Sequence, residues 1–263
     1  REMCDTKKVL DYCNLLSKYY YYNVSDGTKE DIDNAIDYTK KMCELGNTYS
    51  CYDVLVMQIK HKNDYTGADE FFKKTPDFAT NIAYSFESGE MDGIINHENA
   101  IKYYKIACEN GKNTFACHKL ARYYLNGDFL PKDEKKAVQY MENSCVNGYE
   151  DCYEIASFYE KGVHVKKDIN KAKELYEKGC KNFNDNSCYK AGFLNLYAKD
   201  VKPNYEIAKK SFEIGCYELH ETSSCNELVN IYTNGLGVKK DLKKVMFLKD
   251  GIKKLKPSNS LYM

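Results

Sequence analysis

Cysteine is the residue whose number and spacing suggest chemistry in this chain, which contains twelve of them. Taken in order they form six pairs, and the members of each pair stand seven to nine positions apart. Structural zinc sites usually keep about two to four residues between paired ligands, whereas these pairs keep six to eight. An even number of closely paired cysteines is typical of disulfides made in an oxidising compartment. The bonds predicted are Cys4–Cys13, Cys43–Cys51, Cys108–Cys117, Cys145–Cys152, Cys180–Cys188 and Cys216–Cys225.

Ser187 and Lys190 are spaced as in the S-x-x-K motif, in which a serine nucleophile has a lysine as its proton partner. The K-T-G and S-D-N elements that complete such a β-lactamase site do not occur in the chain. An activated nucleophile also needs a base and an oxyanion donor, and the sequence signals neither. With 13 serines and abundant lysine, a match of this kind is expected by chance. We therefore predict no catalytic residue and no cofactor.

The five histidines fall at different positions along the chain and share no partner spacing. A metal site would need several ligands at spacings that a fold can bring together. The sequence therefore predicts surface or helix-cap positions for them, and no metal site. They are His61, His97, His118, His164 and His220.

The elements that must position the cysteines are clearest between Asp168 and Cys188. Asp168 is a good helix N-cap, and apolar or small residues follow it at helical spacing. Along one helix Cys180 and Cys188 would lie about 12 Å apart, beyond the roughly 7 Å that a disulfide allows between Cα atoms. The chain must turn between them, and the Asn- and Asp-rich segment 181–187 suits a turn. The stretch therefore predicts a helix, a tight turn and a second helix.

This unit repeats along the chain with a period of about 36 residues. Each copy has a small residue in its first helix, an N-cap residue four positions earlier and, in five copies, a cysteine eight positions later. We predict an all-α fold, a right-handed superhelical solenoid of about seven helical hairpins, most of them stapled by a disulfide. The array is expected to span residues 1–252, with a C-terminal tail at 253–263. The small residues, called anchors below, are Ala35, Ala68, Ala100, Ala137, Ala172, Ala208 and Val245, and the expected N-caps are Asp31, Asp64, Asn96, Asp133, Asp168, Asn204 and Asp241.

The unit anchored at Ala68 departs from this pattern, because Pro76 and Ala79 occupy its two cysteine positions. No disulfide can form there, and Pro76 is expected to end the first helix. We expect this unit to be the softest part of the array. Three phenylalanines are expected to compensate with extra apolar burial. They are Phe71, Phe72 and Phe78.

The charge of the chain is balanced, with 39 basic and 39 acidic residues interspersed as on solvated helix faces. A balanced charge gives no long-range field that would favour nucleic acid or an anionic membrane. No apolar run approaches the roughly 18 to 20 residues needed to span a bilayer. Neither a nucleic-acid partner nor a membrane span is therefore expected. The first residue is Arg1 and not Met, as in a mature product from which any signal peptide has been removed or in a recombinantly expressed form.

Two stretches display the connection between repeats, YEKGVHVKKDINKAKELYEKGC at 159–180 and YTNGLGVKKDLKKV at 232–245. They resemble the SEL-one-like repeat, a relative of the tetratricopeptide repeat with a G-x-G-V-x-x-D-x-x-K-A core, which Gly237, Val238 and Asp241 match. The paired cysteines make the chain similar to the cysteine-rich subgroup, known best as the Helicobacter cysteine-rich protein family of secreted or periplasmic bacterial proteins. The resemblance covers nearly the whole chain.

Second helices are expected to end at glycines in the left-handed conformation, at Gly127, Gly162 and Gly235. The chain departs from the repeat pattern at His164 and Val201, where the loop glycine is missing.

The resemblance implies penicillin binding, in some members weak β-lactamase activity, and a role as a secreted factor met by a host. The repeat architecture itself predicts a concave surface lined by the first helices, on which a protein or peptide can bind across several units. We therefore expect a periplasmic or secreted scaffold whose partner is a protein or peptide, including host or cell-envelope proteins. The alternatives are a β-lactam or cell-wall peptide binding protein with weak β-lactamase activity, and an assembly factor of the mitochondrial intermembrane space.

Overall fold

The computed structural model describes residues 4, 10–23, 28–91, 93–145, 151–199 and 202–255. Within these ranges the chain is built of helices and their connections, and no strand occurs. Its contacts divide it into two compact units, residues 1–113 and 114–263. The all-helical hairpin architecture is as predicted. The single array over residues 1–252 and the handedness of its superhelix stay predictions, and most of the expected tail lies outside the described residues.

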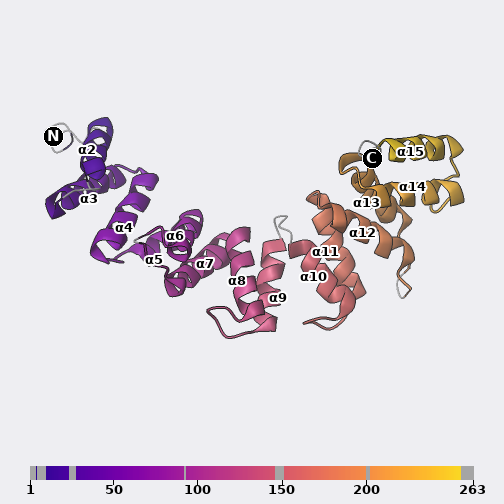
Figure 1. Cartoon of the computed structure of the whole chain (residues 1–263), viewed down its shortest axis with the longest axis horizontal. Coiled ribbons are helices and arrows are strands. Elements are labelled where there is room, and N and C mark those ends of the chain that lie inside the picture. Colours follow the sequence, from indigo (N-terminus) through magenta and orange to yellow (C-terminus); the bar gives the residue numbers. More distant parts are fainter. Residues whose placement is uncertain are drawn as a thin grey trace, which may run out of the picture. The chain divides into compact units, whose positions relative to one another are not determined.

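Successive helices pack as hairpins within each unit (Figure 1). A first helix and the second helix that follows it make one repeat, as α3 with α4 or α11 with α12. Residues 1–113 contain α2 (Leu10–Asn23), α3 (Lys29–Glu44), α4 (Thr48–Lys62), α5 (Ala68–Lys74), α6 (Pro76–Ser88) and α7 (His97–Gly111). Residues 114–263 contain α8 (Thr114–Asn126), α9 (Glu134–Ser144), α10 (Asp151–Lys161), α11 (Ile169–Lys181), α12 (Asp185–Tyr197), α13 (Tyr205–Glu213) with the π-helical turn η2 (Ile214–Glu218), α14 (Thr222–Asn234) and α15 (Leu242–Leu255).

The predicted anchors lie at the helix contacts. Ala35, Ala100 and Ala172 are fully buried, as are the other alanine anchors, and Val245 is 6% exposed. A small side chain at this point lets neighbouring helices approach closely, while larger residues around it fill the remaining volume. The repeated small residue therefore sets the spacing between helices.

Five of the seven predicted N-caps accept a hydrogen bond from the backbone three residues on. They are Asn96, Asp133, Asp168, Asn204 and Asp241, with distances of 3.0 to 3.1 Å. Two predictions were wrong. Thr28 is the N-cap of α3, and Asp31 is its third helical residue, which accepts from the Thr28 backbone in a capping box. Asp64 instead accepts from the Thr66 N–H in a turn before α5.

The unit anchored at Ala68 has a short first helix of seven residues. Thr75 ends α5 and precedes α6, and Pro76 is the first residue of α6, where the N–H that proline lacks would have no helical partner. The aromatic packing expected here is present. The ring of Phe72 is fully buried and lies 5.0 Å from that of Tyr103 and 6.2 Å from that of Tyr52.

The loops after the second helices use left-handed residues as predicted. Gly127, Gly162 and Gly235 have φ of 84°, 74° and 74°. His164, which replaces a loop glycine, is also left-handed, with φ of 60°. Its ring lies 4.9 Å from that of Phe158, and this contact helps to hold a conformation that an L-residue adopts at a cost. Val201 lies outside the described residues. No helix in the described ranges is long and apolar enough to cross a membrane.

Candidate functional site

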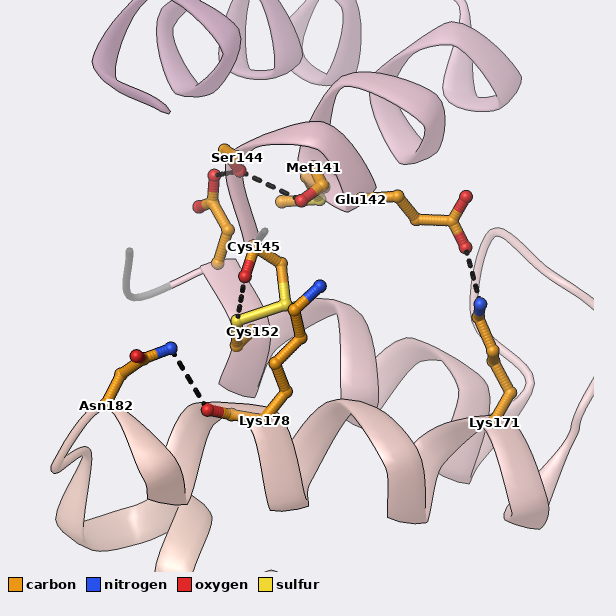
Figure 2. The surroundings of a disulfide bond; sticks show 9 residues. Met141, Glu142, Ser144, Cys145, Cys152, Lys171, Lys178 and Asn182 are labelled. Atoms are coloured by element: carbon orange, nitrogen blue, oxygen red, sulfur yellow. Dashed lines mark hydrogen bonds and ion pairs between the residues drawn. A yellow bond between two sulfur atoms is a disulfide. The ribbon is translucent and has the colours of Figure 1, made fainter. Parts of the chain in front are cut away.

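The cysteines pair across the hairpin turns as the spacing predicted. The bonds Cys4–Cys13, Cys43–Cys51, Cys145–Cys152, Cys180–Cys188 and Cys216–Cys225 have Cα–Cα distances of 4.3 to 4.9 Å. Figure 2 shows one of them, with Cys145 at the end of α9 and Cys152 in α10. Cys108 and Cys117 lie in different compact units, so their pairing stays a prediction. Four of these bonds tie a first helix, or the turn η2 that continues α13, to the second helix of the same hairpin.

In two hairpins the residues directly before the two cysteines of a pair face each other. A Cβ atom added to Gly179 would lie 2.4 Å from the Ser187 hydroxyl, and one added to Gly215 would lie 2.4 Å from the Ser224 hydroxyl. Such separations are too short for real contacts, so glycine is required for the helices to approach this closely. The repeat pattern had not assigned a role to these positions.

The S-x-x-K motif does not assemble into a nucleophilic site. Ser187 is fully buried against Gly179, and no described residue forms a hydrogen bond with its hydroxyl. Lys190 instead donates to both carboxylate oxygens of Glu160, at 2.9 and 3.1 Å. Tyr176 donates to the same carboxylate at 2.7 Å, and burial, followed by this acidic neighbour, raises the pKa of its phenol. Lys190 is therefore part of an ion pair between second helices α10 and α12.

A polar cluster that the sequence reading missed lies beside the Cys145–Cys152 bond. Asp151 is 1% exposed, accepts from His118 Nδ1 at 2.7 Å and is hydrogen-bonded to the Ser144 hydroxyl. Ser144 also contacts the Met141 carbonyl at 2.9 Å, as Figure 2 shows. The carboxylate lies between serine and histidine, whereas a catalytic triad needs the histidine in the middle. The cluster therefore links α8, α9 and α10 structurally.

The remaining histidines were expected at surfaces and caps. His164 contacts Glu134 at 3.0 Å, and this contact, followed by that of Lys132, lowers the pKa of the Glu134 carboxyl. His220 is exposed and left-handed, with φ of 55°, in the turn before α14. Among the described residues no three His, Cys, Asp or Glu side chains are placed to hold a metal ion.

A groove between consecutive first helices α11 and α13 offers a binding surface. Its volume is about 250 Å³, and Ile207, Ile214 and the Cys180 side chain line its apolar part. Four charged residues line the rest, namely Glu177, Lys181, Glu206 and Lys210. None of the four makes an ion pair with any described residue.

Glu177 is held in place from behind this groove. Its carboxylate accepts from Asn195 Nδ2 at 2.7 Å. Asn195 is 1% exposed, and its other amide hydrogen bond goes to the Ala191 carbonyl at 2.9 Å. Asn195 stands where other second helices carry Tyr124, Tyr159 or Tyr232. A sequence comparison between repeats would have shown this exception.

The comparison with protein families agrees with the hairpin array. A family model described as the Sel1 repeat matches six segments, residues 10–47, 76–112, 114–149, 150–182, 185–213 and 223–244. The chain belongs to the Sel1 repeat family. Among curated proteins none matches the chain. In the unit anchored at Ala68, the family model matches only from residue 76, where the second helix begins. The first helix of this unit is present in the structure although the model does not match it.

The solved structures that are similar to this chain are distant from it in sequence. A protective antigen present in uropathogenic Escherichia coli strains, described as displaying an SLR fold, is 18% identical over 95% of this chain, with a TM-score of 0.50. The chain spans 62% of that protein's length. A Sel1 repeat protein from Oxalobacter formigenes is 20% identical over 96% of this chain and 90% of its own, with a TM-score of 0.45. At this identity the similarity extends to the fold alone.

Proposed function

We propose that this Sel1 repeat protein is an extracytoplasmic scaffold that binds an extended protein segment along the first helices of consecutive repeats. The family fold is that of a repeat scaffold for protein interactions. The disulfides support an oxidising compartment, since cytosolic thiols are kept reduced. The periplasm or the cell exterior would provide such an environment.

The observation that carries the proposal is the groove between α11 and α13. Its charges are unpaired among the described residues, and an unpaired charge beside an apolar surface gains from a ligand of opposite charge. Glu177 and Lys181 stand one helical turn apart on α11, as Glu206 and Lys210 do on α13. An extended segment with charges of both signs and an apolar side chain between them complements this surface.

Rigidity of the scaffold favours such binding. The Cys180–Cys188 and Cys216–Cys225 bonds hold the two repeats that form the groove. A surface that is already ordered loses less conformational entropy when it binds a flexible segment. Most of the conformational entropy lost on binding is therefore lost by the ligand.

A peptide array probed with the purified, oxidised protein tests the proposal. We expect selection of peptides with alternating charge, and binding that weakens as salt is raised. Glu177→Gln and Lys210→Gln should each weaken the best peptide about tenfold, as expected for loss of a charge-assisted contact. Glu174→Gln, on an exposed position of α11 outside the groove, is the matched control. Equal losses in all three variants, or none in the groove variants, would refute this location.

A further inference from the structure

A cavity of about 300 Å³ lies among α2, α3 and α4, far along the chain from the groove between α11 and α13. Its lining combines apolar side chains, such as Met42 and Met57, with several polar ones. Pockets that bind small molecules have this size and this mixture of an apolar wall with a few placed polar groups. The cavity therefore has the general properties of a ligand site.

The cavity exists because one repeat lacks a large side chain that other repeats have. Four positions after the anchor, five first helices carry a bulky residue that is fully buried, whereas in α3 this position is Thr39 and in α15 it is the exposed Lys249. A small residue at a position built for a ring leaves unfilled volume that the surroundings fill only in part. The bulky residues are Phe72, Tyr104, Met141, Tyr176 and Phe212.

Three hydroxyl groups, those of Ser17, Thr39 and Ser50, belong to residues that line this cavity. The Ser17 and Thr39 hydroxyls are 2.5 Å apart, and Thr39 donates its proton to the Ala35 carbonyl at 2.7 Å. Because a hydroxyl has one proton, Ser17 must be the donor to Thr39, which leaves the Ser17 oxygen with lone pairs to offer. Ser50 is 4% exposed and also lines the cavity. The Ser17 oxygen can therefore accept a hydrogen bond from a ligand in the cavity.

Two opposite charges border the same cavity from facing helices. Lys18 lies on α2 and Asp53 on α4, and neither makes an ion pair with any described residue. Partial burial raises the pKa of the Asp53 carboxyl, and burial followed by Asp53 raises that of the Tyr52 phenol to about 12. A carboxylate in this position is stabilised by a cation that enters the cavity.

We propose that this cavity binds a free α-amino acid with an apolar or aromatic side chain. Its ammonium group contacts Asp53, its carboxylate contacts Lys18, and its side chain takes the space that Phe72 or Tyr176 fills in their own repeats. This site does not depend on the scaffold function proposed above, because it uses none of the groove residues.

Calorimetric titration with L-phenylalanine, N-acetyl-L-phenylalanine and L-phenylalaninamide tests the proposal with the intact chain. L-Phenylalanine is expected to bind one to one. Each blocked derivative lacks one charge and should bind about tenfold more weakly or worse. Absence of L-phenylalanine binding at millimolar concentration would overturn the proposal, as would equal affinity for the three compounds.

Three variants locate the site. Thr39→Phe restores the side chain of the other repeats, so it should abolish binding while raising the melting temperature. Asp53→Asn and Lys18→Gln change exposed rim residues, so they should fold and each weaken L-phenylalanine about tenfold. Lys210→Gln, in the other groove, is the control and should leave binding unchanged. Unaltered binding in both rim variants would overturn the proposal even if Thr39→Phe failed to fold.

Discussion

Ser187 and Ser224 occupy the same position of two successive repeats, directly before the second cysteine, yet their hydroxyls have different surroundings. Both residues are fully buried. Ser224 donates to Glu221 at 2.6 Å, whereas the Ser187 hydroxyl has no partner within the described part of the chain. A buried hydroxyl contributes to stability only when it is hydrogen-bonded. The two serines therefore form a matched pair for measuring what a single hydrogen bond contributes.

Ser187→Ala is expected to leave the free energy of unfolding unchanged or to raise it by up to about 1 kcal/mol, because it removes an unsatisfied hydroxyl and keeps the Cβ contact with Gly179. Ser224→Ala is the control and should lower it by about 1 kcal/mol. Urea unfolding of the oxidised protein measures both. A larger loss in the Ser187 variant than in the Ser224 variant would show that the Ser187 hydroxyl has a partner or a role of its own.

Asp151→Ala should be far more damaging than either serine change. It removes the acceptor that the partly buried His118 ring and the buried Ser144 hydroxyl share, a loss of about 3 kcal/mol. The double variant Ser144→Gly with Asp151→Ser copies the Gly179–Ser187 arrangement and should be less damaging. Urea unfolding again gives the comparison. A double variant less stable than Asp151→Ala would mean that the cluster does more than fill the helix contact.

At the scale of elements, the sequence predicted helices and turns well because each repeat contains the same N-cap and anchor positions. The prediction failed where a local signal departs from the repeat register. Thr28 with Asp31 is a capping box, so α3 begins earlier than the repeat position implies. Gly67 supplies the left-handed residue before α5, which begins later than Asp64 implies. Both exceptions were missed because the same N-cap position, four residues before the anchor, was assumed in every repeat.

The unit anchored at Ala68 should be the least stable part of the chain. Each disulfide elsewhere closes a loop of about nine residues, which contributes roughly 2.5 kcal/mol in the chain-entropy model, and this unit has none. Hydrogen exchange followed by mass spectrometry should show faster exchange in residues 64–90 than in the hairpin α3–α4. Equal protection would mean that the packing of Phe72 and its neighbours compensates fully for the missing bond.

The candidate sites were less predictable than the fold, because they depend on contacts between helices and on differences between repeats. The groove between α11 and α13 requires side chains about 30 positions apart to face each other, and no local motif signals this. Thr39 becomes noticeable only when its repeat position is compared with Phe72 and Tyr104. Ser187 with Lys190 is the one motif with a known chemistry, but a match of this kind is expected by chance. In the structure, Ser187 packs against Gly179 and is shielded from solvent.

At the scale of the whole molecule, the disulfides should dominate stability. Reduction with a phosphine should lower the melting temperature by at least about 10 °C, since several short loops lose their closure together. Circular dichroism with and without reductant measures the shift. Alkylation of the native protein should modify no thiol of the bonded pairs. Extensive alkylation without reductant, or an unchanged melting temperature, would contradict the proposed oxidised state and with it the oxidising compartment.

The short reach of the disulfides has a consequence for how the protein is made and how it can evolve. Each bond described joins cysteines at most nine positions apart, so the correct partner is the next cysteine along the chain. Closing so small a loop is entropically cheaper than reaching a cysteine of another repeat. A chain that oxidises as it emerges, amino end first, forms native bonds without reshuffling. Whole units can also be duplicated or deleted without leaving an orphan thiol.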